Sequence, residues 1–408
     1  MSKKIRYLEI DGNSLGFKIG AATLAALLLA GLYAFFEMHG QGHRITGMDN
    51  QISWGLPHVF AIFLIVAASG ALNIASIATV FNKTPYKPLA RLSTWLAIAL
   101  LMGGVMVLVL DLGKPEHVWH MIQHANMTSM FAANIVLYPV FLATAVVYLW
   151  TMMDYHVYKY YKAVGLFAFV WRLLLTTGTG SIFGFLVGRT SYDAALIAPL
   201  FVVLSFAYGL AIFLLCLLGT YRWTGRPLGD ALVQRLKNLL GVFVAAAFYL
   251  VLVHHLTNLY SAERSGFEKF ILSGSSIHTP LFWIGQIFLG TAIPLILFYS
   301  KLGKSRFWIA TGAMLILVGA FCQMYVTIIG GQAFPQQTVP AEYIITSSPF
   351  GDANTFHSYT PSAWEALLGL GGVALAALMV MYGCKLLRFL PESLADKDLD
   401  PHFKSATT

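Results

Sequence analysis

Cysteine is scarce in this sequence, and its arrangement excludes several redox centres. The 408 residues contain three cysteines, Cys216, Cys322 and Cys384, and none belongs to a CxxC or CxxCH motif. The chain therefore has no cysteine set for an iron–sulfur cluster of its own and no attachment site for a c-type haem. Each cysteine lies within an apolar run, which is typical of a buried hydrophobic thiol.

Charged residues are also few, at 11% of the chain, whereas hydrophobic residues make up 58% and the mean hydropathy is +0.70. A water-soluble globular protein does not have this composition. The net charge of +8 could indicate nucleic acid. However, most basic residues lie in short loops between apolar runs, where an anionic membrane surface accounts for them. We therefore expect a lipid bilayer around the chain and no nucleic-acid partner.

Ten apolar runs of the sequence are long enough to cross a bilayer, since a span needs about 20 mostly apolar residues. Unpaired backbone is not tolerated in lipid, so each run is predicted to be helical. The sequence thus predicts an all-α integral membrane protein with about ten transmembrane helices. The predicted spans are 15–37, 53–80, 88–110, 127–152, 163–188, 194–219, 238–260, 277–300, 306–330 and 362–387.

The loops predict the orientation and the grouping of these spans. Most of the 26 lysines and arginines fall in the two termini and in every second loop, which predicts that both termini are cytoplasmic. The polar N-terminus and the long first run argue against a cleavable signal peptide. Loop lengths predict two packed helical bundles, 15–190 and 191–387, between a cytoplasmic N-terminus (1–14) and a cytoplasmic tail (388–408). The outer loop 331–361 has no lysine or arginine and is expected to bind a partner or cap the bundle.

Histidine is distributed unevenly between the two sides of the membrane. Only His156 and His402 of the 12 histidines fall on the predicted cytoplasmic side, and acidic residues at helix ends follow the same asymmetry. Histidine titrates near neutral pH, and ionisable groups at a membrane boundary are candidates for function. The ordinary alternative is that such residues only mark polar helix ends.

The densest polar stretch is the outer loop 111–126, which reads DLGKPEHVWHMIQHAN. Asp111 ends the third predicted span, and Pro115 suits the first turn of a new helix. The spacing then predicts one shared helical face for His117, His120 and His124. Such a face could bind a polar headgroup, relay protons or ligate a metal, but no HExxH or similar pattern supports a metal site.

Two further features of the spans leave alternatives open. His58 and His254 lie at similar depth and could ligate a b-type haem, but no second pair exists on the inner side, so haem b is disfavoured. Arg172 lies near the middle of a span, where an arginine must be paired or hydrated. With Thr176 and Asn134 it could form a proton path from the inside, or a structural polar clamp between helices.

The DLGKP motif at 111–115, with Trp119 and His120 after it, resembles the signature of NrfD-type membrane subunits of the polysulfide reductase family. Lys114 replaces the usual arginine and loses its planar fork, and NMTSM at 126–130 lacks the proline and arginine of the family's second segment. IIGGQAFP at 328–335 and YTPSAWEALLGL at 359–370 resemble the family's ten-helix branch, which contains the hydrogenase-2 membrane subunit. Within it, the sequence is most similar to DsrP, the membrane subunit of the Dsr sulfur-metabolism complex.

The resemblance implies that the chain binds menaquinone or ubiquinone as substrate near the outer face. It also implies a periplasmic ferredoxin-like iron–sulfur subunit as partner, with cytochrome c and haem b/iron–sulfur subunits in a larger complex of the bacterial inner membrane. The candidate catalytic residues are Asp111, His120 and His58. The candidate headgroup-binding residues are His117, Asn126, His254, Glu365 and Glu37. A transporter-like ion-translocating bundle and a haem-b anchor subunit are the alternatives.

Overall fold

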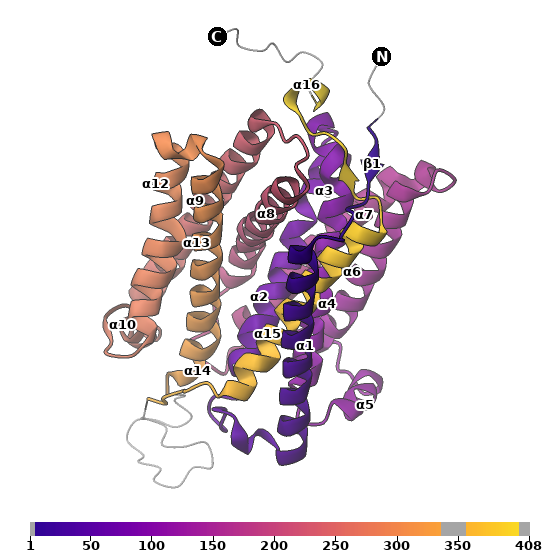
Figure 1. The fold of residues 1–408 in the computed structure, drawn as a ribbon. Helices are drawn as coiled ribbons and strands as arrows, with labels where there is room; N and C mark the ends of the chain where they lie inside the picture. Colours follow the sequence, from indigo (N-terminus) through magenta and orange to yellow (C-terminus); the bar gives the residue numbers. More distant parts are fainter. Residues whose placement is uncertain (1–4, 336–355, 400–408) are drawn as a thin grey trace, which may run out of the picture.

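The computed structural model describes residues 5–335 and 356–399, and its described residues contain ten helical spans (Figure 1). The membrane fold class predicted from hydropathy is therefore confirmed. Most spans are single helices: α1 (Leu15–Gln41), α4 (Ala90–Leu110), α6 (Met130–Met153), α7 (Tyr161–Gly184), α8 (Ile197–Thr224), α9 (Asp230–Tyr260) and α15 (Ala363–Leu386).

The other three spans are interrupted helices. The second span is α2 (Leu56–Ala71) followed by α3 (Asn73–Thr79). The eighth span joins α11 (His278–Pro280), the π-helix η5 (Leu281–Ala292) and α12 (Ile293–Tyr299), and the ninth joins α13 (Arg306–Tyr325), the π-helix η7 (Val326–Gly330) and α14 (Gly331–Ala333). The short elements are α5 (Val118–Gln123), α10 (Ser265–Ser273), α16 (Asp396–Leu399), β1 (Tyr7–Leu8), β2 (Leu390–Pro391) and the 3₁₀ turns His43–Ile45, Thr84–Leu89, Pro115–His117, Tyr158–Tyr160 and Lys301–Lys304.

α8 and α9 extend furthest beyond the apolar runs that predict them. α8 continues to Thr224 and ends at Gly225, whose φ of 65° lies in the left-handed region, which glycine adopts without strain. α9 begins at Asp230, eight residues before the predicted start at 238. Hydropathy ends a span where charged residues begin, but the helix continues because Leu236 and its apolar neighbours remain buried.

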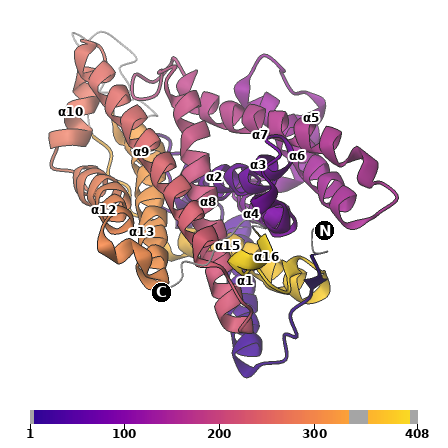
Figure 2. The ribbon, with the colours of Figure 1, turned by 90° about the horizontal axis from the view of Figure 1, so that it is seen from above.

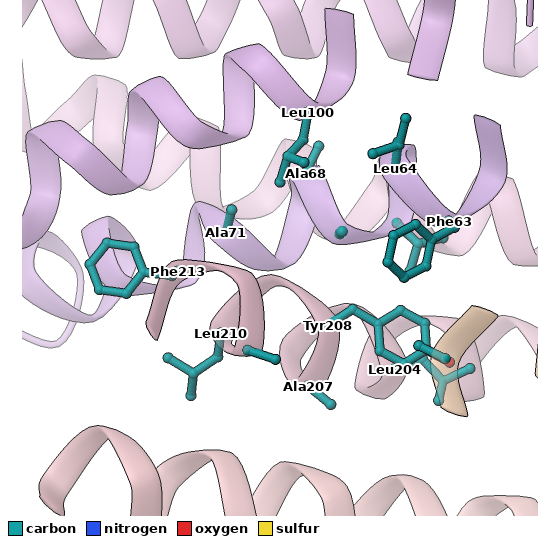
Figure 3. Close-up of a cluster of buried hydrophobic side chains, with 14 of the residues drawn as sticks. Phe63, Leu64, Ala68, Ala71, Leu100, Leu204, Ala207, Tyr208, Leu210 and Phe213 are labelled. Atoms are coloured by element: carbon teal, nitrogen blue, oxygen red, sulfur yellow. The ribbon is translucent and has the colours of Figure 1, made fainter. Parts of the chain in front are cut away.

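The core of the molecule lies where α2 packs against α4 and α8. Figure 3 shows Phe63, Leu64, Leu204 and Tyr208 among the buried side chains of this contact. Small residues let the backbones of α2 and α8 approach closely. A Cβ atom at Gly209 would collide with the backbone of α2.

The last span returns to the first one. α15 packs against α1 and α4. This helix of the second predicted bundle (191–387) is therefore in contact with two helices of the first (15–190). β1 pairs antiparallel with β2, with Tyr7 opposite Pro391. β1 and α16 therefore lie at one end of the bundle and α5 at the other (Figure 1). Seen from above, α8 lies between α2 and α9 (Figure 2).

Candidate functional site

A cavity of about 520 Å³ opens at the end of the bundle that carries α5. Its wall is mostly apolar, with a few polar side chains, which is the usual composition of a small-molecule site. We call it the His58 cavity. Its polar and aromatic lining residues are His43, Ser53, Trp54, His58, Asp111, Phe131, Asn134, Tyr138 and Phe183.

Two predicted catalytic residues meet in the wall of this cavity. His58 Nδ1 lies 2.7 Å from Asp111 Oδ2, although the residues are 53 positions apart in the chain. Asp111 is 3% exposed. Among the described residues, neither His58 Nδ1 nor either Asp111 carboxylate oxygen has a partner with hydrogen-bond geometry, despite this short distance. A buried carboxylate normally accepts several hydrogen bonds, so this one retains accepting capacity for a ligand.

Local structure fixes both side chains. Asp111 is the C-cap of α4, and its backbone N–H bonds to Val107 O at 2.9 Å. His58 lies in the first turn of α2, just after Pro57, which favours a helix start. The indole of Trp54 stacks on the His58 ring, with centroids 6.1 Å apart and planes at 25°.

The segment that leads into α2 is held by Gln332, which belongs to the IIGGQAFP motif. Gln332 Oε1 accepts from Trp54 N at 2.9 Å, and its Nε2 donates to Trp54 O at 2.9 Å. Arg189 adds two bonds from its guanidinium, to Gln332 O at 3.2 Å and to Gln51 O at 3.0 Å. Burial lowers the pKa of Arg189. The ninth span thus positions Trp54 and, through it, His58.

The predicted histidine face forms only in part. The helix after the DLGKP motif, α5, ends at Gln123, so His124 is its C-cap rather than a member of the same face. His117 and His120 are exposed, with ring centroids 5.9 Å apart. Only the apolar side of α5 lines the His58 cavity. A catalytic role for His120 and headgroup binding by His117 stay predictions.

Asn126 and Glu37 also lie outside the cavity lining. Asn126 Oδ1 accepts from Thr128 N at 3.1 Å and caps the turn before α6. Glu37 is near the end of α1 and accepts from Gln41 Nε2 at 2.6 Å. Their geometry suits local structure, and their predicted binding roles stay predictions.

Glu365 is fully buried in a hydrogen-bonded network that joins three segments. Its Oε2 accepts from Gly47 N at 2.8 Å and from Ser362 N at 2.7 Å, which completes a capping box at the start of α15. Tyr359 donates its hydroxyl to Glu365 Oε1 and accepts from Leu56 N at 2.7 Å. Burial and this carboxylate raise the pKa of Tyr359. Glu365 therefore anchors the loop before α2.

His254 belongs to a second polar cluster, in the part of the molecule formed by α9 and α10. Its Nε2 lies 3.3 Å from Asn258 Nδ2, which also donates to Glu268 Oε1 at 2.9 Å. His255 Nδ1 lies 2.6 Å from Glu268 Oε2. His254 lies on α9 and His58 on α2, and both helices pack against α8, which lies between them (Figure 2).

Of the three predicted proton-path residues, Asn134 lies on α6, and Thr176 and Arg172 lie on α7. Asn134 lines the cavity and donates to Gly178 O at 3.1 Å. Thr176 Oγ1 donates to Ser69 Oγ at 2.5 Å. Arg172 is 1% exposed and donates to Asn73 Oδ1 at 3.0 Å.

Several lining residues carried no signal in the sequence. Phe131, Tyr138 and Phe183 are ordinary aromatic residues of apolar spans, and only folding turns them toward one space. Trp54 lies two residues before the start of α2, in the bend that leads into the helix, and its position there carried no signal of the contact with His58. Within the described part of the chain, no three His, Cys, Asp or Glu side chains are grouped so that they could hold a metal ion.

Comparison with known proteins agrees with this architecture. The family described as "Polysulphide reductase, NrfD" matches residues 44–336. The chain belongs to the NrfD polysulphide reductase family. The match contains every residue that lines the His58 cavity except His43. The resemblance drawn from the DLGKP motif is confirmed at the level of the family, and the assignment to DsrP stays a prediction.

Three relatives extend over most of the chain. The Hdr-like menaquinol oxidoreductase integral membrane subunit of Archaeoglobus fulgidus is 29% identical, covering 96% of this chain and 98% of its own. The menaquinone reductase integral membrane subunit of Nitratidesulfovibrio vulgaris is 23% identical, covering 89% of each chain. A subunit of the selenate reductase of Mesobacillus selenatarsenatis is 22% identical, covering 88% of this chain and 91% of its own.

Proposed function

We propose that this chain is the quinone-reactive membrane subunit of an oxidoreductase complex, with the quinone headgroup in the His58 cavity. The observation that carries the proposal is the buried Asp111 carboxylate, 2.7 Å from His58 Nδ1 in the wall of an apolar cavity. The names of the relatives support it, since two are membrane subunits of a menaquinol oxidoreductase and a menaquinone reductase. The substrate is menaquinone or ubiquinone.

The proposed chemistry is proton-coupled electron transfer. Oxidation of a quinol releases two electrons and two protons. The His58–Asp111 pair takes one hydroxyl proton, which requires a donor–acceptor distance of about 2.6–3.2 Å in the complex. The second hydroxyl proton leaves to water at the mouth of the cavity. Trp54 and Phe131, whose ring centroids are 5.5 Å apart, provide flat apolar surfaces for the quinone ring. The electrons leave to a partner subunit, because the sequence has no cysteine motif for a cluster.

The proton route is proposed to run between the cavity and the end of the bundle that carries the termini. Asn134, Thr176 and Arg172 supply polar groups at successive depths, as a relay through a bilayer requires. In the direction of quinone reduction the cavity consumes two protons, so replacing Thr176 with valine is expected to slow proton uptake by reconstituted vesicles while leaving quinol binding unchanged. Equal proton uptake in the two proteins would show that these groups only clamp helices together.

The proposed setting follows from the loop charges and the family. The termini are cytoplasmic, the His58 cavity faces the periplasm, and the membrane is the inner membrane of a bacterium. The partner is a periplasmic ferredoxin-like iron–sulfur subunit, with cytochrome c and haem b/iron–sulfur subunits in a Dsr-type complex. Purification with or without iron–sulfur partners separates this setting from an isolated transporter, and a visible spectrum of the chain detects haem b.

The function is tested by measuring quinol oxidation and quinone binding in the purified complex with Asp111→Asn. The matched control is Glu116→Gln, which makes the same change of charge on an exposed residue of the same loop. We expect Asp111→Asn to lower kcat about 10²–10⁴-fold, the usual loss when a general base is removed, and Glu116→Gln to leave it near the wild-type value. Equal activity of the two variants would contradict the proposed site.

A further inference from the structure

A second large cavity lies at the opposite end of the bundle from the His58 cavity. It has a volume of about 660 Å³ and opens among α1, α8 and α15. We call it the Gly219 cavity. In Figure 1 these helix ends lie on the side of β1 and α16. Nothing in the proposed quinone chemistry uses this space.

The lining of the Gly219 cavity changes from polar to apolar with depth. Its rim contains Asp11, Asn13, Ser14, Thr220, Thr224 and Arg226. Its deep wall contains Phe63 and Leu64 of α2, Leu100 of α4 and Leu317 of α13. An occupant must therefore have a polar end at the membrane surface and an apolar end in the bilayer.

The depth of the Gly219 cavity corresponds to one leaflet of a bilayer. α8 lines it from Ile212 to Thr224, which is about 18 Å of helix at 1.5 Å per residue. α15 lines it from Val373 to Cys384, or about 16 Å. The hydrocarbon of one leaflet is about 15 Å thick. An acyl chain can therefore lie along these helices while its headgroup stays at the rim.

The rim carries groups suited to a phosphate. The Arg226 guanidinium is oriented by its bonds to Leu8 O at 3.4 Å and Glu9 O at 2.6 Å, and its planar fork matches phosphate oxygens. The Lys385 side chain lies against Gly12, another lining residue. The Asp11 carboxylate accepts from Asn13 Nδ2 at 2.8 Å. Arg226 and Lys385 therefore lie beside the rim segment that carries Asp11, whose carboxylate has a hydrogen-bond donor, and Glu9, whose carboxylate pairs with Arg388 at 3.2 Å.

From this polarity, depth and charge, we infer that the Gly219 cavity binds one membrane glycerophospholipid, with its phosphate at Arg226 and an acyl chain along α8. Trp223, which is exposed and lines the rim, lies where interfacial aromatic residues contact headgroups. The lipid fills the space between α1, α8 and α15, and so joins the first and last spans to the centre of the molecule.

Gly219 allows the cavity to be filled without disturbing the protein. It lines the cavity, and a Cβ atom placed on it meets no other atom within 4 Å. Gly219→Leu therefore extends a side chain into the proposed acyl site. Gly40→Leu is the matched control, since Gly40 also has open space around its Cβ and does not line the cavity.

The test is native mass spectrometry of the purified full chain, delipidated and then mixed with phosphatidylglycerol. Diacylglycerol with the same acyl chains, which lacks the phosphate, is the second probe. We expect one tightly bound phosphatidylglycerol per chain. Gly219→Leu should lower its affinity about tenfold or more, since overpacking of a filled site is costly, and Gly40→Leu should not change it.

The phosphate contact is tested with Arg226→Gln and Lys385→Gln. Each should reduce the preference for phosphatidylglycerol over diacylglycerol about tenfold, the effect of losing a charge-assisted bond. Lys385→Gln leaves both backbone bonds of Arg226 intact, so it remains informative if Arg226→Gln does not fold. Equal binding of both lipids by the wild type, retention of lipid by Gly219→Leu, or displacement of the lipid by quinone would overturn the inference.

Discussion

The contact between His58 and Asp111 makes a specific prediction about how their effects combine. If the two side chains act as one proton acceptor, removing either should abolish the same step. We therefore expect Asp111→Asn and His58→Gln each to lower kcat for quinol oxidation about 10²–10⁴-fold. In free energy this is about 3–5.5 kcal/mol of lost transition-state stabilisation, at 1.36 kcal/mol per tenfold. The assay is steady-state quinol oxidation by the purified complex.

The double variant distinguishes a shared role from two separate ones. Residues that act as a unit are strongly non-additive, so the double variant should be no slower than the worse single variant. Independent roles would multiply to about 10⁴–10⁸-fold. A multiplicative loss, or wild-type activity in either single variant, would refute the reasoning.

Stability provides an independent control for the same variants. The Asp111 side chain is 1% exposed and that of His58 is 19% exposed. His58→Gln removes the polar group nearest to a buried carboxylate, at a cost of about 1–3 kcal/mol, the usual penalty for leaving a buried polar group unsatisfied. Asp111→Asn removes the buried charge itself, so its thermal unfolding midpoint should equal or exceed that of the wild type. Low activity with undiminished stability would identify Asp111 as functional rather than structural.

Two further predictions concern packing and the support of the site. Gly209→Leu should prevent folded expression because the leucine side chain would collide with α2. Gly219→Leu, on the same helix, should express normally. Equal yields of the two variants in a fluorescence-detected size-exclusion assay would contradict this prediction. Gln332→Leu should raise KM for quinol and lower the unfolding midpoint, because Trp54 loses two hydrogen bonds worth about 1 kcal/mol each; unchanged KM would separate Gln332 from the site.

The sequence predicted the spans because a bilayer imposes a simple condition on every crossing segment. Each must be apolar and internally hydrogen-bonded over its whole length, so hydropathy alone located ten helices. It failed at the start of α9, which begins at Asp230, since Asp230, Arg235 and Lys237 interrupt the apolar run there although the backbone stays helical. The DLGKP motif correctly indicated the family.

The sequence did not distinguish the histidines that share the cavity wall from those that do not. His120 is nine residues from Asp111, yet it lies on the exposed side of α5. His58 is 53 positions away, and the packing of α2 on α4 brings it within 2.7 Å of the carboxylate. Glu365 also proved to belong to a hydrogen-bonded cap. Sequence distance gives no measure of such contacts once helices pack side by side.

The amino-acid sequence by itself determined that this protein crosses a membrane ten times and that one of its loops gathers ionisable residues. Both properties depend on local composition, because each segment partitions between water and lipid according to its own residues. Only the tertiary structure decided which ionisable groups become partners, because Asp111, His58 and Gln332 come from three different spans. Close helix packing then determines where those spans meet, where the two cavities remain, and which polar atoms face them.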